Sequence, residues 1–154
     1  MNFWQVAAGE GGRDYSDVFL KYGVMLIGSG DPGPYFEREE YYRNRPWGHT
    51  IGYFAKHVDK GDIVILKKPH HQQWQIQAVG RVVGEYEWLE QFDDVHGWHL
   101  QHCRKVEWLR PTTCLVIDGL ARGTFRRVYK SQVKVVAQRV LEEGQKQPVS
   151  EIPP

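Results

Sequence analysis

The sequence contains few features that mark a secreted or membrane protein. Two cysteines, Cys103 and Cys114, are present in 154 residues, which is too few for a disulfide framework. No apolar run approaches the roughly 18 residues of a membrane span, and the N-terminal segment MNFWQVAAGEGG lacks a basic and apolar signal sequence. We therefore expect a cytoplasmic protein with no membrane partner.

The motifs of common catalytic sites are also missing. The glycine-rich segment 9–13 lacks the Lys-Ser/Thr pair of a phosphate-binding loop, and no Gly-x-Ser-x-Gly sequence is present. Glu85 and Glu87 are followed by Trp88, where a metal-dependent nuclease would need a lysine. We predict no catalytic residues, no cofactor, and no magnesium- or manganese-dependent cutting of nucleic acid by this chain alone.

Histidines gather in one stretch, but their spacing does not favour zinc. His96, His99 and His102 follow one another at intervals of three, and Cys103 is adjacent. Structural zinc sites need two clean pairs of ligands, whereas these residues cross an expected boundary between a loop and a strand. Their side chains would then point in different directions, and no metal site is predicted.

The net charge of +1 argues against non-specific coating of nucleic acid, which depends on a large positive field. It leaves room for a pocket with a local basic rim. Solvated surface explains any one basic cluster, but beside an aromatic cage such a cluster could hold phosphates. Three clusters are visible: Lys56, Lys60, Lys67, Lys68, His70 and His71; Arg104, Lys105 and Arg110; and Arg122, Arg126, Arg127, Lys130 and Lys134. Our candidate phosphate-binding residues are Lys67, Lys68, Arg104 and Lys105.

A long hairpin is the clearest structural element in the sequence. Ile63–Leu66 is an apolar, β-branched run, and Trp74–Val79 begins with apolar residues at alternate positions. Gly80 breaks the alternation, which predicts a kink where the sheet curls. One curled sheet is expected from Phe3–Ala8, Val24–Ile27, Ile63–Leu66, Trp74–Glu87 and Cys103–Leu109.

Helical spacing predicts the elements that flank this sheet. Tyr15–Tyr22, capped by Asp14 or Ser16, and Gln132–Glu143, capped by Ser131, each place apolar residues on one face. Shorter helices are predicted at Phe36–Asn44, Thr50–Val58 and Thr124–Tyr129. The chain is thus expected to be α+β, a small curled β-barrel flanked by helices, with one domain over residues 1–144. Residues 145–154 (QKQPVSEIPP) are expected to be a flexible, linker-like tail leading to a C-terminal effector domain or partner subunit.

Aromatic residues beside loops suggest a binding site. Trp47, Trp88 and Trp98 lie at or next to loops, and Tyr35 ends the Gly/Pro-rich loop 28–34. Aromatic walls around a polar slot suit an extruded base, because every base has a stacking face. The structural alternative is that these rings close loops over the ends of the barrel.

Several segments resemble EVE-type domains of the PUA-like superfamily. They are Phe3–Glu10 (FWQVAAGE), Gly23–Gly28 (GVMLIG), Lys60–Val64 (KGDIV), Ala78–Val82 (AVGRV), Gly84–Trp88 (GEYEW) and Arg104–Trp108 (RKVEW). The resemblance covers roughly residues 3–143. It implies a compact barrel that reads a modified base, as in the related YTH readers of methylated RNA and the DNA-reading domains of modification-dependent restriction systems.

The resemblance also implies a pocket. Carried over by position, the pocket residues of YTH-like readers are Asp14, Tyr15, Gly28, Ser29 and Trp98. Many relatives have Trp directly after Ile-Gly, where this chain has Ser29, so a second wall is expected from Tyr35 or Trp47. Asp14 and the Ser29 hydroxyl would supply polar contacts.

We expect the module to flip a methylated cytosine or adenine of DNA into this cage, as the targeting domain of a restriction system. A reader of modified RNA is the nearest alternative. A hydrolase acting on nucleotides and a protein-interaction module are alternatives of other classes.

Overall fold

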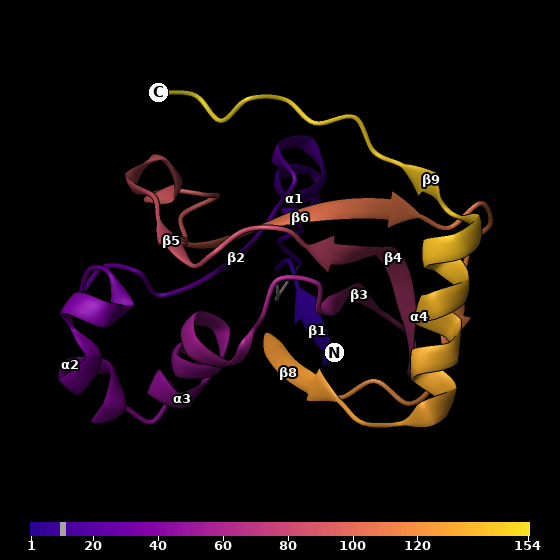
Figure 1. Ribbon diagram of the computed structural model, residues 1–154, viewed down its shortest axis with the longest axis horizontal. Helices are drawn as coiled ribbons and strands as arrows, with labels where there is room; N and C mark the ends of the chain where they lie inside the picture. Colours follow the sequence, from indigo (N-terminus) through magenta and orange to yellow (C-terminus); the bar gives the residue numbers. More distant parts are fainter. Residues whose placement is uncertain (10–11) are drawn as a thin grey trace.

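The computed structural model describes residues 1–9 and 12–154 and shows a mixed α+β fold. Its sheet curls into a half-barrel whose main path follows the order β2-β6-β4-β3-β1-β8 (Figure 1). β1 and β3 are parallel, and the other neighbours on this path are antiparallel. The strands of the path are β1 (Phe3–Ala7), β2 (Val24–Ile27), β3 (Ile63–His70), β4 (Gln73–Val82), β6 (His102–Arg110) and β8 (Phe125–Val128).

All five predicted strands are present in this one sheet, with some boundaries shifted. β4 ends at Val82, and only β5 (Glu87–Trp88) pairs with β6 beyond it. β7 (Val116–Ile117), which was not predicted, pairs with β4. The predicted curled sheet is therefore confirmed. β2 and β8 are the first and last strands of its path.

Both faces of the sheet are buried, and the alternation along β1 shows how. Trp4 and Val6 belong to a core cluster inside the curl, whereas Phe3 belongs to a second cluster on the outer face. Successive side chains of a strand point to opposite faces, so each strand supplies both cores. This accounts for the continuous burial of Ile63–Lys67 in β3.

The irregularity of the long hairpin lies away from Gly80. The β3–β4 register shifts between Leu66 and Lys67, because Leu66 pairs with Ala78 and Lys67 pairs with Ile76. Gly80 instead lies where β6 approaches closely, since an added Cβ would come within 2.3 Å of Val106 Cγ1. The glycine is required by packing against β6, and the extra residue of the bulge is Gln77.

Helical segments cover the ends and the outer face of the sheet. α1 (Ser16–Tyr22) follows an Asp14 side chain that accepts from Ser16 N at 2.9 Å. The predicted helix 36–44 is a 3-10 turn, η1 (Tyr35–Glu37), followed by α2 (Glu39–Arg43). The predicted helix 50–58 is α3 (Gly48–Gly52), which continues as a π-helical segment, η2 (Tyr53–His57). A further 3-10 turn, η3 (Glu90–Phe92), follows β5.

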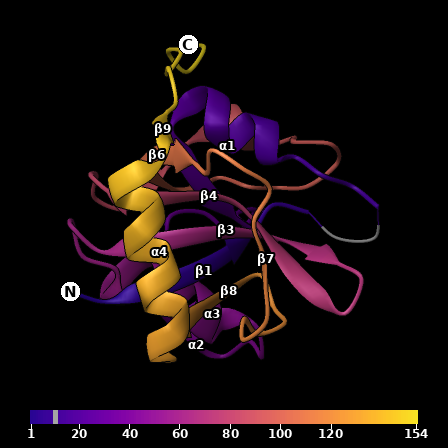
Figure 2. The ribbon, with the colours of Figure 1, turned by 90° about the vertical axis from the view of Figure 1, so that its right-hand side faces the viewer.

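α4 (Ser131–Glu143) lies across the outer face of the sheet (Figure 2). Its Val133, Ala137 and Val140 pack in the outer core cluster with residues of β3 and β4. Ser131 is its first residue, and its N-cap is Lys130, which makes no side-chain capping bond, so the prediction of Ser131 as the cap was wrong.

The prediction of a helix at 124–129 was also wrong. These residues form β8, which pairs antiparallel with β1. Phe125 packs in the inner cluster and Val128 in the outer one. A spacing of three residues looks helical in the sequence, but here it joins the two buried ends of a strand, which pack on opposite faces of the sheet, while Arg126 and Arg127 between them are exposed.

The C-terminal segment contacts the domain instead of leaving it as a linker. β9 (Gln145–Lys146) pairs with the end of β6, and the segment continues past α1 (Figure 1). Ser150 N donates to Lys21 O at 2.8 Å, and Ile152 packs against the inner core cluster. The expectation of a free tail at 145–154 is thereby corrected.

Candidate functional site

A pocket of about 330 Å³ opens where the end of β1, the start of α1, the end of β2 and the loop before β6 meet. Four of the predicted base-binding residues line it: Tyr15, Gly28, Ser29 and Trp98. The other lining residues are Ala7, Gly9, Gly97, His99, Leu100 and Thr124. We call this cavity the Trp98 pocket. It combines two aromatic rings with hydroxyl, imidazole and backbone polar groups.

A tight turn positions Trp98. Val95 and Trp98 exchange two backbone hydrogen bonds of 2.9 Å, and the residues between them, His96 and Gly97, have positive φ of 53° and 88°. Two central residues with positive φ are typical of a type I′ hairpin turn. Arg13 holds the turn from outside, because its Nη1 donates to His96 O at 3.2 Å and its guanidinium lies 6.0 Å from the Trp98 ring.

The indole N–H of Trp98 is buried and has no acceptor among the residues that the structure describes. Three other tryptophans do have one: Trp4 donates to Asp62, Trp88 to Gly30 O and Trp108 to Val24 O, at 2.8–3.0 Å. An unsatisfied buried donor costs about 1–3 kcal/mol. Trp98 is therefore placed less favourably for folding than those three, and that observation favours a role in binding.

The chain passes so close to the loop before β6 that Gly28 has no room for a side chain. An added Cβ would lie 2.7 Å from His99 O, and Gly30 N donates to that same carbonyl at 3.0 Å. The His99 ring is held by Asp31, whose Oδ1 lies 3.1 Å from Nδ1. These contacts tie the end of β2 to the loop that carries Trp98.

Ser29 is fixed by a buried chain of hydrogen bonds that the sequence did not reveal. Its carbonyl lies 3.2 Å from His102 Nε2, and His102 Nδ1 lies 2.6 Å from the Tyr86 hydroxyl, which also accepts from Tyr35 N at 2.9 Å. A carbonyl can only accept, so Nε2 carries the proton and Nδ1 accepts from Tyr86. Burial lowers the pKa of His102 to about 4 and raises that of Tyr86 to about 12, so both are neutral at pH 7.

The two candidates for a second wall lie outside the Trp98 pocket. Tyr35 is buried, with its ring 5.7 Å from that of Tyr42. Trp47 is 40% exposed, and its ring lies 5.8 Å from the same Tyr42. Tyr35 contributes to the site only through its backbone N–H at the end of the Tyr86–His102 chain. Within the pocket, Tyr15 is the aromatic residue that accompanies Trp98.

Asp14 lies next to the pocket residue Tyr15 but does not line the cavity. One carboxylate oxygen accepts from Ser16 N, and the other lies 3.3 Å from Lys68 Nζ. Partial burial opposes ionisation, yet the bonds from Ser16 and Lys68 together lower the pKa of Asp14. In this structure Asp14 organises the start of α1 and binds Lys68.

Two of the four candidate phosphate-binding residues are buried. Lys67 is 1% exposed, and its Nζ donates to Gln5 Oε1 and to Ala121 O. Arg104, also 1% exposed, donates to Gly84 O and Phe54 O at 3.1 Å. These cations are used inside the protein and cannot reach a phosphate as placed, which corrects our interpretation of both. Lys68 is exposed and Lys105 half-buried.

The burial of Lys67 predicts an alkaline effect on stability. Burial lowers its pKa from 10.5 to about 8, so between these values the unfolded chain binds a proton that the folded chain releases. The free energy of unfolding should therefore rise with pH across this window. Between pH 8 and pH 10, the free energy of unfolding of the wild type should rise by ~2 kcal/mol relative to that of Lys67→Met. Denaturant titrations of both proteins measure this difference. The matched control is Lys68→Met at the exposed neighbouring lysine. A difference in free energy of unfolding between the wild type and Lys67→Met that does not change with pH would contradict the prediction.

The histidine-rich stretch does not gather into a metal site. Among residues 1–9 and 12–154, no group of three or more His, Cys, Asp or Glu side chains could hold a metal ion. His102 and Cys103 are buried in β6, while His96 lies exposed in the turn. No helix in the described part of the chain is long and apolar enough to cross a membrane.

A protein-family model matches most of the chain. The model of a family described as Domain of unknown function (DUF8426) matches residues 4–130. This range includes all strands of the main sheet path, except for the first residue of β1, Phe3. It also includes the whole lining of the Trp98 pocket. No curated protein matches the chain.

Proposed function

We propose that this chain, which belongs to the DUF8426 family of domains of unknown function, is a nucleic-acid-binding module that holds one modified base in the Trp98 pocket. DNA methylated on cytosine or adenine is the proposed ligand, and modified RNA is the alternative. The half-barrel is compatible with a PUA-like barrel, to which the sequence bears its resemblance. In this proposal the module binds, and any cutting belongs to a further domain or partner.

The observation that carries the proposal is the composition of the Trp98 pocket. Its volume of about 330 Å³ lies at the lower end of the range for small-ligand sites. Trp98 and Tyr15 are its aromatic residues, of which Trp98 is the more exposed, and Ser29, His99 and Thr124 are its residues with hydrogen-bonding side chains. A flipped base needs this combination, because it is held by stacking and identified by polar contacts to its edge.

Hydrolysis receives less support from the same residues. Ser29 and His99 both line the pocket, and Asp31 orients the His99 ring. A nucleophile (Ser29), a base (His99) and a carboxylate that orients the base (Asp31) therefore lie near one another. However, no hydrogen bond joins Ser29 to His99 in the described structure, and Nδ1 of His99 also lies 2.8 Å from Asp93 O. The contact that would activate a serine is therefore not formed.

A binding screen tests the proposal. Labelled DNA and RNA carrying methylcytosine, hydroxymethylcytosine or methyladenine should be titrated against unmodified strands of the same sequence by fluorescence anisotropy. One modified strand should bind at least about fivefold tighter than its unmodified partner, which corresponds to the lower limit for one stacked base. Equal affinity for every modified and unmodified pair would overturn the proposal.

A further inference from the structure

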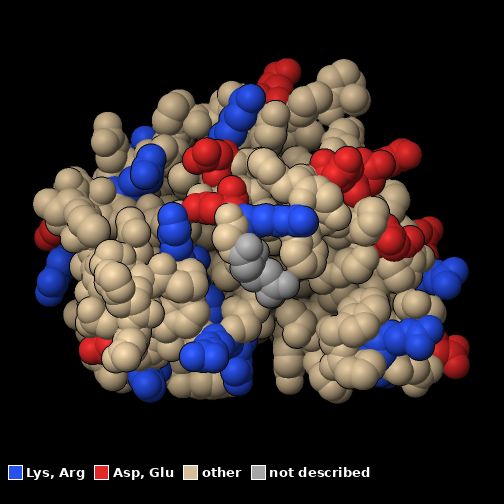
Figure 3. Space-filling view, turned by 180° about the vertical axis from the view of Figure 1, so that it is seen from behind, with Lys and Arg blue, Asp and Glu red and all other residues tan. Residues whose placement is uncertain are grey.

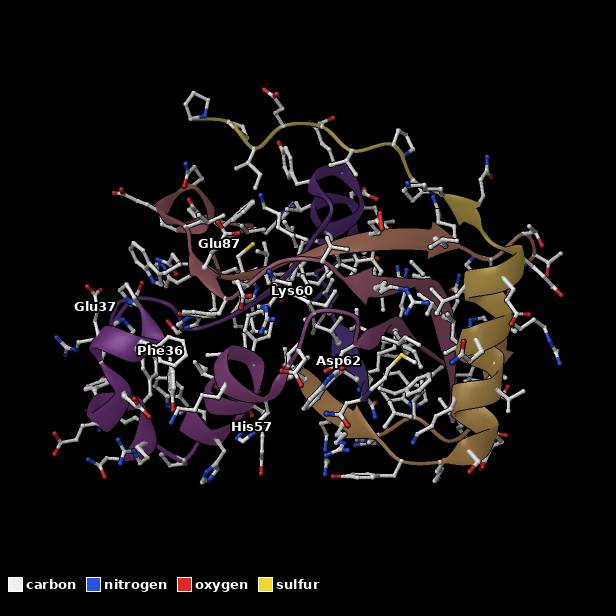
Figure 4. The ribbon with its side chains drawn as sticks, in the orientation of Figure 1. Phe36, Glu37, His57, Lys60, Asp62 and Glu87 are labelled. Carbon is white, nitrogen blue, oxygen red and sulfur yellow. The ribbon has the colours of Figure 1, made fainter. Side chains whose placement is uncertain are left out.

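A second, larger cavity of about 920 Å³ lies between β8 and the α3–η2 segment. Seen from behind, the molecule is hollowed at this place, with lysine and arginine side chains beside the hollow (Figure 3). One wall is formed by residues 122–127 and Tyr129, the other by His49, Thr50, Tyr53, Lys56 and His57, and Asn2, Trp4 and Asp59 complete the lining. We call this cavity the basic groove. His57 lies on its η2 side (Figure 4).

The positive charge of the protein is concentrated here. Four cations line the groove, Lys56, Arg122, Arg126 and Arg127, against one carboxylate, Asp59, which leaves a formal charge of +3. The whole chain carries only +1. Buried Asp62 adds no free acceptor, because its two oxygens accept from Asn2 N, Trp4 Nε1 and Asp59 N. A concave surface with such an excess attracts polyanions.

The three arginines have no carboxylate partner among the described residues. Arg126 Nη1 is 3.5 Å from Arg122 O, and Arg127 Nη2 donates to Asn2 Oδ1 at 2.6 Å. Lys56, in contrast, pairs with Glu39. Guanidinium groups bind phosphates with two parallel hydrogen bonds, and the nitrogens not used in these contacts are free to do so.

Exposed aromatic rings accompany the arginines. Tyr53 on one wall is 51% exposed, and Tyr129 on the other wall is 72% exposed. The Tyr129 ring lies 5.2 Å from the Arg127 guanidinium, and the Tyr53 ring lies 5.2 Å from that of His57. A charged groove with aromatic platforms is the arrangement that binds single-stranded nucleic acid.

A simpler explanation covers only part of this surface. β8 is the last strand of the sheet path, and charged residues on an edge strand prevent pairing with other chains. This accounts for Arg126 and Arg127. It does not account for Arg122, which precedes the strand, or for Tyr53, which faces it from the opposite wall.

The basic groove and the Trp98 pocket meet at Thr124, which lines both cavities. Its carbonyl accepts from Ala7 N at 2.8 Å, which fixes it against the end of β1. A strand lying in the groove would therefore run beside a residue that also lines the pocket. A duplex is read by protein elements that protrude into its grooves, whereas this surface is concave.

We infer that the basic groove binds one strand of nucleic acid, with phosphates on Arg122, Arg126 and Arg127 and bases stacked on Tyr53 and Tyr129. The inference rests on the proposed function, because it takes nucleic acid as the ligand. It adds that the ligand is single-stranded and that the strand is held independently of its modification.

The test uses unmodified oligonucleotides of about a dozen nucleotides, a length within the range for one single-strand-binding domain. Fluorescence anisotropy should compare single-stranded DNA, single-stranded RNA and duplex DNA of one sequence at several salt concentrations. Single strands should bind more tightly than the duplex. Joint replacement Arg126→Ala and Arg127→Ala should weaken single-strand binding about tenfold or more and reduce the slope of log affinity against log salt by ~1.4.

Matched variants separate charge and stacking from damage to the fold. Arg139→Ala removes an exposed charge from α4 and should leave binding within twofold of the wild type. Tyr53→Ala should weaken single-strand binding about fivefold or more, whereas Tyr53→Phe should keep it. Unfolding curves of all variants verify that they fold. Duplex binding as tight as single-strand binding, or double-variant losses no larger than those of Arg139→Ala, would overturn the inference.

The two proposals fail in different ways. If the arginine variants bind normally while a modified base is still preferred, the groove inference falls and the pocket stands. If the arginines and Tyr53 are needed but no modification is preferred by any strand, the groove inference stands and the pocket proposal falls. The DNA and RNA arms identify which nucleic acid supplies the strand.

Discussion

Replacing Trp98 with alanine is expected to weaken binding of the preferred modified strand by about five- to a hundredfold. The variant removes one ring face of the Trp98 pocket, and a stacked base is worth roughly 1–3 kcal/mol. The loss should be larger for the modified strand than for its unmodified partner, since the basic groove is untouched. Anisotropy titrations of both strands, with wild type and variant in parallel, give the ratio directly.

Two further variants show whether the ring acts in binding or in folding. Trp98→Phe keeps a stacking face, so most of the preference for the modified strand should remain. It removes an indole N–H that has no acceptor among the described residues, so the variant loses no hydrogen bond that stabilises the fold. Trp47→Ala deletes an exposed tryptophan outside the pocket and should leave the preference intact. Trp98 is half-buried, so some loss of stability is expected in Trp98→Ala. Complete unfolding of that variant, or undiminished preference, would contradict the pocket.

The residues brought together in the Trp98 pocket were accessible from the sequence because each lies at an element boundary. Gly28 and Ser29 follow the apolar run of β2, Tyr15 directly precedes α1, and Trp98 follows the His96-Gly97 turn. Glycine, a capping aspartate and the end of an apolar run mark such boundaries locally. Resemblance to a pocket-bearing fold then indicated which boundaries converge.

The residues that were misplaced depend on partners distant in the sequence. Lys67 is buried because Ala121 O and Gln5 accept from it, and Arg104 is buried because Phe54 O and Gly84 O do. A lysine or arginine in a strand looks like a surface residue until those acceptors are known.

The Tyr86–His102–Ser29 chain escaped prediction for the same reason. His102 stands in a histidine-rich stretch for which no metal site was predicted, and nothing local distinguishes it from His96 or His99. Only the fold places Tyr86 and the Ser29 carbonyl on either side of its ring.

That buried histidine should make the protein sensitive to acid. Burial lowers the pKa of His102 from 6.5 to about 4, so between these values the unfolded chain takes up a proton that the folded chain excludes. The free energy of unfolding should therefore fall as the pH is lowered from 7 to 4, by ~3 kcal/mol from this residue alone. Above pH 7 the histidine is neutral in both states, and its effect on the pH dependence ends.

Carboxylates also titrate in this range, so the quantity to measure is the difference in free energy of unfolding between the wild type and a His102 variant. His102→Gln keeps a side-chain N–H that can reach the Ser29 carbonyl but has no proton to gain. We expect it to be less stable than the wild type at pH 7, because the buried contacts with Ser29 and Tyr86 are imperfectly replaced. The deficit should shrink or reverse by pH 4. His70→Gln, which removes an exposed histidine, controls for the loss of a histidine as such.

The same variants connect the buried chain to the pocket. If His102 positions Ser29, then His102→Gln and Tyr86→Phe should both lower the preference for the modified strand at pH 7.5, although neither side chain lines the pocket. The affinity for unmodified single strands should be unchanged, since the basic groove shares no residue with this chain of hydrogen bonds. If the free energies of unfolding of the wild type and His102→Gln fell by the same amount from pH 7 to pH 4, the proposed neutral, buried histidine would be refuted. A normal preference in both variants would show instead that the chain of hydrogen bonds serves folding and not the pocket.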